Sequence, residues 1–305
     1  MAATGEHVAM TLDAVILAVS AGRPRLLIVD GTDRGAALPS GPLDARRDTT
    51  LELGMRRLIR QQTGLEVGYI EQLYTFGDLD RSPPSGDGRL VSVAYVALVR
   101  ETAPSATSRW VDAYDLFPWE DHRDRTQQQL LSALRASLDA WANGDEQRRQ
   151  RIQLMFGAPW DGTRVLERYE LLYEAQLVAE AEAGAEAGAG TDGAEALGQP
   201  LASDHRRIAA TALGRIRGKL TYRPVVFELL PATFSLLELQ RTVEALAGVQ
   251  LHKQNFRRLV ERSGLVEGTG ERRAGTAGRP AELFRYRPSV QLERPRPGVG
   301  GIPYR

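Results

Sequence analysis

The chain has 305 residues, of which 26% are charged and 42% are hydrophobic, and it contains no cysteine. This length predicts two domains with a core of substantial size. The absence of cysteine excludes a disulfide scaffold, a thiol nucleophile and cysteine-bound zinc or iron–sulfur groups. No stretch approaches the ~18 consecutive apolar residues of a transmembrane helix, and residues 1–10 lack the basic and apolar regions of a signal peptide. We therefore expect a cytoplasmic protein that makes no contact with membranes.

The formal net charge of zero conceals an asymmetry along the chain. Residues 1–202 contain 20 basic and 30 acidic residues, whereas residues 203–305 contain 19 basic and 9 acidic residues. A basic segment joined to an acidic one is typical of an attached nucleic-acid-binding module. On charge alone, a solvated basic face is the alternative explanation.

The first part of the chain predicts an α+β domain over residues 7–140, a mixed sheet with flanking helices. Three segments rich in β-branched and apolar residues predict strands, at 7–19, 25–29 and 90–99. A helix is predicted at 51–62 from apolar residues at helical spacing, namely Leu51, Met55, Leu58 and Ile59. Thr49 or Thr50 can cap its start, and Gly64 stands where a helix-terminating glycine is expected.

The middle of the chain predicts a helical insertion followed by a linker, together at 141–203. The helix patterns cover 125–141, 145–155 and 163–182, and an Ala/Gly/Glu-rich segment with little to bury follows them. The pattern at 163–182 is amphipathic, so this helix either packs on the first domain or pairs with a partner or a second copy.

The basic third predicts a connecting helix at 204–219 and then a winged helix-turn-helix domain at 220–290, with residues 291–305 as a tail. Helix patterns at 235–247 and 252–263 precede two β-like pieces at 265–267 and 282–286, which is the order of elements in that fold. The second helix buries Phe256 and presents Arg, Asn and Gln, the residue types that bind base edges in the major groove. The candidate DNA-binding residues are Ser235, Lys253, Gln254, Asn255, Arg257, Arg258, Arg272, Arg273 and Arg279.

Arg279 belongs to a Gly-Arg-Pro sequence, Gly278 to Pro280, in the loop expected to form the wing. A narrow loop of this kind can place an arginine in the minor groove. Double-stranded DNA is therefore the predicted partner of this domain.

Residues 38–65 resemble the loop–helix–loop signature of Nudix hydrolases. The chain keeps the glycine, arginine and aliphatic positions of that signature at Gly41, Arg57, Ile59, Gly64 and Leu65. Uncharged residues occupy all its acidic positions, namely Thr49, Leu58, Gln61 and Gln62. The hydrolases depend on Mg²⁺ held by carboxylates, and Gln offers only a neutral amide oxygen. The resemblance therefore implies a Nudix-like fold without catalytic residues, and we predict neither a metal nor a cofactor.

Such a domain can still bind a nucleotide, because several arginines surround the expected pocket without the lost glutamates to balance them. The candidate ligand-binding residues are Arg46, Arg47, Arg56, Arg57, Arg60, Gln61 and Gln62. The alternative is that Arg57 anchors the preceding loop, its usual role in the family, and that the other arginines are solvated.

Taken together, the degenerate Nudix segment and the winged helix resemble the NrtR-like transcriptional regulators of NAD metabolism. The resemblance covers residues 7–112 loosely and about the last hundred residues well. It rests on Asp204-His205, Arg217-Gly218-Lys219, Phe227-Glu228-Leu229-Leu230-Pro231, Asn255-Phe256-Arg257-Arg258 and Gly278-Arg279-Pro280-Ala281. It implies a homodimeric repressor that binds a palindromic operator and senses a nucleotide effector such as ADP-ribose. The alternative function is a Nudix pyrophosphatase acting on ADP-ribose or a related nucleoside diphosphate derivative.

Overall fold

The computed structural model describes residues 8–32, 35–78, 81, 88–124, 127–182, 197–274, 280–293 and 298–299. The Gly/Ala/Glu-rich part of the predicted linker and Arg279 lie outside the described residues. Within these ranges, no helix combines the length and apolar character needed to cross a membrane.

The first domain is built on a seven-stranded mixed sheet, as predicted. Its strands are β1 (Val8–Ser20), β2 (Arg23–Thr32), β3 (Gly35–Ala37), β4 (Ser40–Pro42), β5 (Tyr69–Phe76), β6 (Arg89–Leu98) and β7 (Ser108–Asp112). The order is β3-β2-β1-β6-β5, with β4 paired to β1 and β7 paired to β2. Strands β1 and β6 run parallel, and the other pairs are antiparallel.

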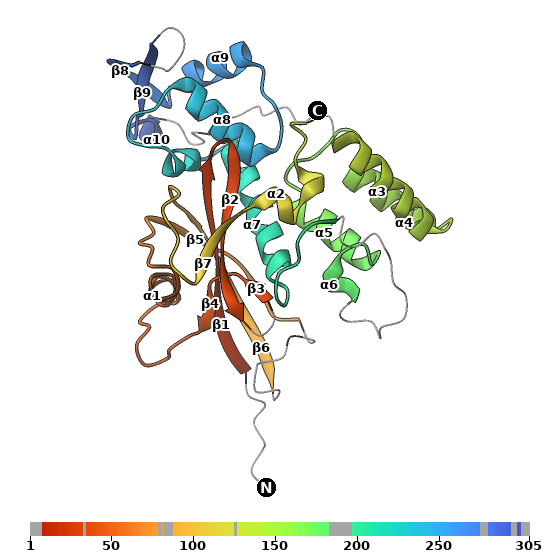
Figure 1. Ribbon diagram of the computed structural model, residues 1–305. Coiled ribbons are helices and arrows are strands. Elements are labelled where there is room, and N and C mark those ends of the chain that lie inside the picture. The colour runs from red at the N-terminus through yellow and green to blue at the C-terminus, as the bar shows by residue number, and fades with distance from the viewer. Residues whose placement is uncertain are drawn as a thin grey trace.

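Strand β1 lies at the centre of this sheet, and both of its faces are buried. Its side chains alternate between the two faces, so Ile16 packs toward helix α1 (Leu51–Thr63) while Val15 and Leu17 join the core on the opposite face. Helix α7 (His205–Leu220) covers that opposite face (Figure 1). An apolar run of strand residues, rather than an alternating one, is the expected sequence of such a doubly covered strand.

The ends of α1 follow the predicted capping residues. The Thr50 hydroxyl accepts a hydrogen bond from the backbone N–H of Leu53, and Gly64 ends the helix with a left-handed φ of 72°. The capping function therefore belongs to Thr50 of the two threonines considered.

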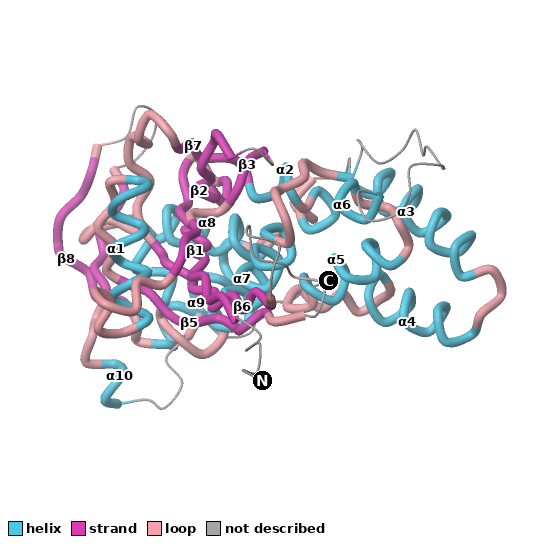
Figure 2. Tube along the Cα trace, turned by 90° about the horizontal axis from the view of Figure 1, so that it is seen from below, coloured by secondary structure: helices cyan, strands magenta, loops and turns pink. Residues whose placement is uncertain are grey.

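The helical block lies to one side of the sheet (Figures 1 and 2). It comprises α2 (Ala113–Leu116), the 3₁₀-helix η1 (Pro118–Glu120), α3 (Gln127–Ala142), α4 (Glu146–Phe156), α5 (Val165–Glu174) and α6 (Ala179–Glu182). The boundary predicted at residue 140 falls inside α3, and the division into domains stays a prediction.

The prediction of one helix over 163–182 is wrong. The chain breaks after α5, where Gln176 adopts a left-handed φ of 57° and the backbone N–H of Ala175 bonds back to Leu171. Tyr173, expected near the apolar face, is 45% exposed, whereas Arg168 is fully buried. The helical periodicity fitted both pieces, but it carried no signal for the turn between them.

The C-terminal domain is a winged helix, as predicted. It contains the 3₁₀-helix η3 (Val225–Leu229), α8 (Leu236–Ala247), α9 (Lys253–Ser263), the hairpin β8 (Val266–Arg273) and β9 (Ala281–Tyr286), and α10 (Val290–Glu293). Phe234 pairs with Phe284 through two backbone hydrogen bonds and so adds a short third strand to the hairpin. Ser235 and Glu238 form the capping box that opens α8.

A buried ion cluster joins the parts of the chain. Glu120 in η1 accepts hydrogen bonds from Arg168 of α5 and Arg217 of α7, and all three side chains are fully buried. Burial alone would raise the pKa of Glu120, but the two guanidinium groups outweigh burial and hold its pKa below the usual range. Glu120 is therefore ionised in the folded protein.

We expect Glu120→Ala to lower the free energy of unfolding by about 3–5 kcal/mol, because it leaves two buried guanidinium groups without their shared carboxylate. The control is Glu174→Ala, which removes the exposed pair with Arg151 and should cost less than about 1 kcal/mol. Urea denaturation of both variants measures the difference. Equal losses in the two variants would contradict the assigned role of Glu120.

Candidate nucleic-acid interface and nucleotide pocket

Helix α9 presents a continuous polar face to solvent. Phe256 and Val260 are buried against the domain, and the residues between and before them are exposed, namely Lys253, Gln254, Asn255, Arg257 and Arg258. The apolar positions lie four residues apart, so the helix has one buried stripe and one wide polar face. The structure therefore brings these five predicted DNA-binding residues together on one surface.

The cations of this helix have no anionic partners in the described part of the chain. Lys253, Arg257 and Arg258 form no ion pair with any described residue. His252 at the N-cap makes no side-chain hydrogen bond to the first turn, which also contains no acidic residue. The first turn of α9 thus contains Lys253, no acidic residue and no side-chain cap from a described residue, an arrangement that favours phosphate.

The remaining predicted DNA-binding residues differ in their surroundings. Arg272 is exposed on β8. Arg273 is paired with Glu238 at 2.9 Å and donates to the carbonyl of Thr233, so it braces the hairpin against the start of α8. The Ser235 hydroxyl accepts from the backbone N–H of Glu238. Ser235 and Arg273 therefore have structural partners already.

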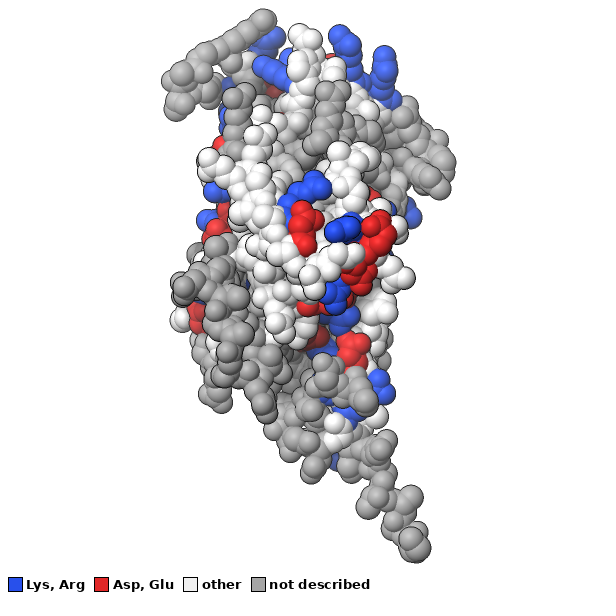
Figure 3. Space-filling model, turned by 90° about the vertical axis from the view of Figure 1, so that its right-hand side faces the viewer, with Lys and Arg blue, Asp and Glu red and all other residues white. Residues whose placement is uncertain are grey.

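Charge is distributed unevenly over the surface (Figure 3). Lys and Arg side chains project from the top of the view, the end at which Figure 1 places α9. Lower down, basic and acidic side chains lie next to each other. Part of the basic surface therefore lies at the end of the molecule that carries α9, where a phosphate backbone can reach it.

In the first domain, the loop that precedes α1 borders a hollow of about 640 Å³. The residues around it are Pro42, Leu43, Asp44, Ala45, Arg46, Arg57 and Leu58. Of the seven predicted ligand-binding residues, only Arg46 and Arg57 line this hollow. Arg46 is exposed and makes no ion pair with a described residue.

Arg57 anchors this loop through Asp48. Its Nε and one terminal nitrogen donate to the two oxygens of the Asp48 carboxylate at 2.8 and 2.7 Å. Hydrogen bonds from Arg57 lower the pKa of Asp48 to about 2, and the same contacts raise the pKa of Arg57. The sequence motif placed Thr49 at the loop's acidic position, and the neighbouring Asp48 was missed because it lies one residue out of register.

Arg47, Arg56 and Arg60 each have an acidic partner. This corrects the expectation from the sequence that the arginines are left unbalanced. Arg56 pairs with Glu52 and donates to backbone carbonyls after α1, Arg60 pairs with Glu66, and Arg47 lies 3.7 Å from Asp44. Partners a few residues away replace the missing glutamates of the Nudix signature.

Gln62 binds the loop with both ends of its amide. Its oxygen accepts from the backbone N–H of Ser40 at 3.1 Å, and its nitrogen donates to the carbonyl of Ser40 at 2.6 Å. Gln61 accepts from Arg57 at 3.0 Å. In the described residues, no group of three or more His, Asp and Glu side chains is arranged to hold a metal ion. The residues present therefore do not fit the Mg²⁺ site of the Nudix signature.

A buried polar cluster connects Ser40 to the start of α7. The Ser40 hydroxyl donates to Asp13 of β1, and Nδ1 of His205 accepts from the backbone N–H of Leu38 at 3.0 Å. His205 Nε2 lies 3.8 Å from Asp13. Burial raises the pKa of Asp13 to about 6 and lowers that of His205 to about 4, so at neutral pH the carboxyl is ionised and the imidazole neutral. Sequence reasoning missed Asp13, because nothing marks a lone Asp in an apolar strand as part of a site.

The fold and these two surfaces define a protein in which a mixed sheet with a loop–helix–loop is joined to a winged helix that exposes a basic helix. Residues 226–286 match the family model of the NrtR DNA-binding winged helix domain. The ADPR-responsive transcriptional repressor NtrR of Acinetobacter baylyi is 25% identical over 281 residues, which cover 91% of this chain and 81% of that protein.

Two solved structures share the fold over nearly the whole chain. Shewanella oneidensis NrtR in complex with a 27mer DNA has a TM-score of 0.58 at 23% identity, covering 93% of this chain and 95% of that one. A MutT/nudix family protein from Enterococcus faecalis has a TM-score of 0.56 at 19% identity, covering 93% and 88%. The predicted fold and the resemblance to NrtR-like regulators are both confirmed.

We expect Gly54→Ala to lower the free energy of unfolding by about 1–3 kcal/mol and to release the loop of Asp48. A Cβ at this position would lie 2.8 Å from an Asp48 oxygen and 3.0 Å from Leu12, and this overpacking outweighs the ~1 kcal/mol that Ala gains over Gly in a helix.

The matched control is Gly218→Ala in α7, where the nearest atom to the added Cβ would be Thr163 Cγ2 at 3.8 Å. That variant should be neutral or stabilising by up to about 1 kcal/mol. Thermal unfolding of both variants tests the pair. A stabilised Gly54→Ala variant would show that the Asp48 contact does not constrain the helix.

Proposed function

We propose that this protein is a DNA-binding transcriptional regulator, a repressor of genes of NAD or related nucleotide metabolism. The observation that carries the proposal is the exposed face of α9, whose Lys253, Arg257 and Arg258 have no anionic partner among the described residues. Its Arg, Asn and Gln side chains suit base edges, and the surrounding cations suit phosphate. The similarity to a repressor and to a structure solved with DNA supports the same function.

We propose further that the protein acts as a homodimer on a palindromic operator, since two copies of one recognition helix related by a two-fold axis match two half-sites in inverted orientation. Arg279, which lies outside the described residues, stays a predicted contact to the minor groove of the same site.

Replacing Arg258 by Ala should weaken binding to an operator duplex by about 1–3 kcal/mol and relax the preference for one base pair, as expected for a bidentate base contact. The duplex is obtained by selecting high-affinity sequences from a random library with the wild-type protein, and affinity is measured by fluorescence anisotropy.

Arg149→Ala is the control, because Arg149 is exposed on α4 and pairs only loosely with Glu146. It should leave affinity unchanged. Wild-type protein that selects no sequence from the library, or an Arg258→Ala variant that binds like the control, would refute the assigned interface.

We also propose that the first domain binds a nucleotide effector such as ADP-ribose without hydrolysing it. The hollow beside Arg46 and Arg57 offers positive charge to a pyrophosphate group. Gln61 and Gln62 stand at the paired glutamate positions of the Nudix signature, and the Gln62 amide already occupies the Ser40 carbonyl. The relative described as ADPR-responsive supports ADP-ribose as the effector.

Incubation with ADP-ribose and either Mg²⁺ or Mn²⁺ should therefore release no AMP above a protein-free blank, while calorimetry without metal detects binding. Arg46→Ala should weaken that binding several-fold, since it removes a cation from the hollow. Chromatography of the reaction mixture measures hydrolysis. AMP release that is abolished in Glu52→Gln would establish residual hydrolase activity and overturn this part of the proposal.

A further inference from the structure

The turn between α8 and α9 is held by Gln240 and Glu244 of α8 and also by residues from outside the winged helix. The Tyr114 hydroxyl donates to the carbonyl of Ala245 at 2.6 Å, and Arg217 Nε donates to the carbonyl of Leu246 at 2.9 Å. Both donors are buried. These carbonyls belong to the last turn of α8, where a helix leaves backbone acceptors without partners of its own.

The next residues of the turn are bound to the segment that follows η1. The backbone N–H of His122 donates to the carbonyl of Gly248 at 2.7 Å, and the Gln250 side chain donates to the carbonyl of Arg123 at 2.9 Å. Four contacts thus hold residues 245, 246, 248 and 250, between the end of α8 and the start of α9.

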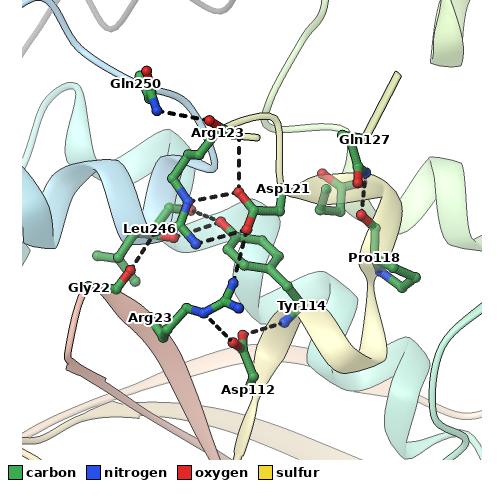
Figure 4. A network of polar contacts seen from close by, with 12 residues as sticks. Gly22, Arg23, Asp112, Tyr114, Pro118, Asp121, Arg123, Gln127, Leu246 and Gln250 are labelled. Carbon is green, nitrogen blue, oxygen red and sulfur yellow. Dashed lines mark hydrogen bonds and ion pairs between the residues drawn. The ribbon is translucent and has the colours of Figure 1, made fainter. Parts of the chain in front are cut away.

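The segment 112–123 is itself fastened to the sheet (Figure 4). Arg23, at the start of β2, bridges Asp112 at 3.1 Å and Asp121 at 3.3 Å. Arg123 pairs with Asp121 and donates to the carbonyl of Gly22 in the β1–β2 turn. The turn before α9 is therefore connected through charge-assisted hydrogen bonds to the tip of the central hairpin.

Gly248 permits a close approach between the turn after α8 and the backbone of Glu120. Its φ is 70°, and a Cβ there would lie 2.3 Å from the carbonyl oxygen of Glu120 and 2.8 Å from Arg217. No residue with a side chain fits between α8 and η1 without moving one of them. The backbone of the turn thus packs directly on the backbone that carries Glu120.

We infer that the α+β domain sets the orientation of α9, with Tyr114 and Arg217 as positioning residues for base recognition. The inference rests on the proposed DNA-binding function and deepens it. Bidentate contacts to bases require hydrogen-bond geometry within a few tenths of an ångström, whereas long cationic side chains adjust to phosphate over a wider range. Loss of a positioning contact therefore reduces affinity for the selected sequence more than affinity for DNA in general.

The test uses the full-length chain with Tyr114→Phe, which removes one hydroxyl and keeps the buried ring. Tyr69→Phe is the matched control, because it removes a hydroxyl that is bonded to Glu71 and Lys219 and to none of residues 245–250. Affinity is measured for the library-selected duplex and for a scrambled duplex of the same composition. For Tyr114→Phe we expect about a fivefold to tenfold loss on the selected duplex, a change of less than twofold on the scrambled one, and faster hydrogen exchange in residues 245–256.

The control should change neither affinity nor exchange in these residues. Equal losses on both duplexes would indicate a merely structural hydroxyl and overturn the inference, as would unchanged affinity in Tyr114→Phe. A second variant, Gly248→Ala, should reproduce the selective loss more strongly, and its failure to do so counts against the inference as well. If wild-type protein binds the two duplexes equally, the proposed function itself is refuted. This outcome is distinguishable from failure of the inference, in which wild-type protein still prefers the selected duplex.

Discussion

Two arginines share one carboxylate at the centre of this protein, and that arrangement constrains every other part. Glu120, Arg168 and Arg217 are fully buried, so each charge has lost its hydration and must be compensated within the protein. Arg168 stacks 3.8 Å over the Trp160 ring and donates to the carbonyl of Asp161, while Arg217 donates to the carbonyls of Gly162 and Leu246. These neutral acceptors stabilise the positive charge that the single carboxylate leaves unbalanced.

The three members of this cluster come from three parts of the chain, which pack against one another around the larger of the two apolar clusters. Glu120 follows the sheet, Arg168 belongs to the helical block and Arg217 to the connecting helix, and Arg217 also reaches the winged helix. The larger group of buried apolar residues runs accordingly from the sheet into α8 and α9. An interface of this kind differs from the flexible linkage that is usual between independent domains.

The sequence predicted the elements well where local rules decide them. The capping of α1 by Thr50, its end at Gly64 and the capping box at Ser235 depend on residues within a few positions of each other. The polar face of α9 followed from periodicity alone. The sequence did not reveal the break at Gln176, because that residue fits a helix pattern and leaves it only through its backbone conformation.

The ion pairs of the two surfaces were less predictable, for a physical reason. Charged residues carry no mark of their partners: Asp48 pairs with Arg57 across the helix start, and Glu120 pairs with Arg217, which is 97 residues away in the sequence. The arginines on α1 were expected to lack acidic partners, but each of them pairs with an acidic residue nearby in the sequence. On α9, by contrast, the predicted cations have no acidic partner among the described residues.

The amide of Gln62 contributes to the way the loop before α1 is joined to α7. A glutamate at position 62 could accept a hydrogen bond but could not donate to the Ser40 carbonyl, whereas the Gln62 amide does both. Ser40 in turn donates to Asp13, which lies beside His205 at the start of α7. Helix α7 spans about 24 Å at 1.5 Å per residue and carries Arg217 near its other end. Polar contacts at the start of α7 thus hold the loop beside the hollow, and Arg217 near its end holds the turn before α9. A ligand that moved this loop would act on one end of a helix whose other end positions α9.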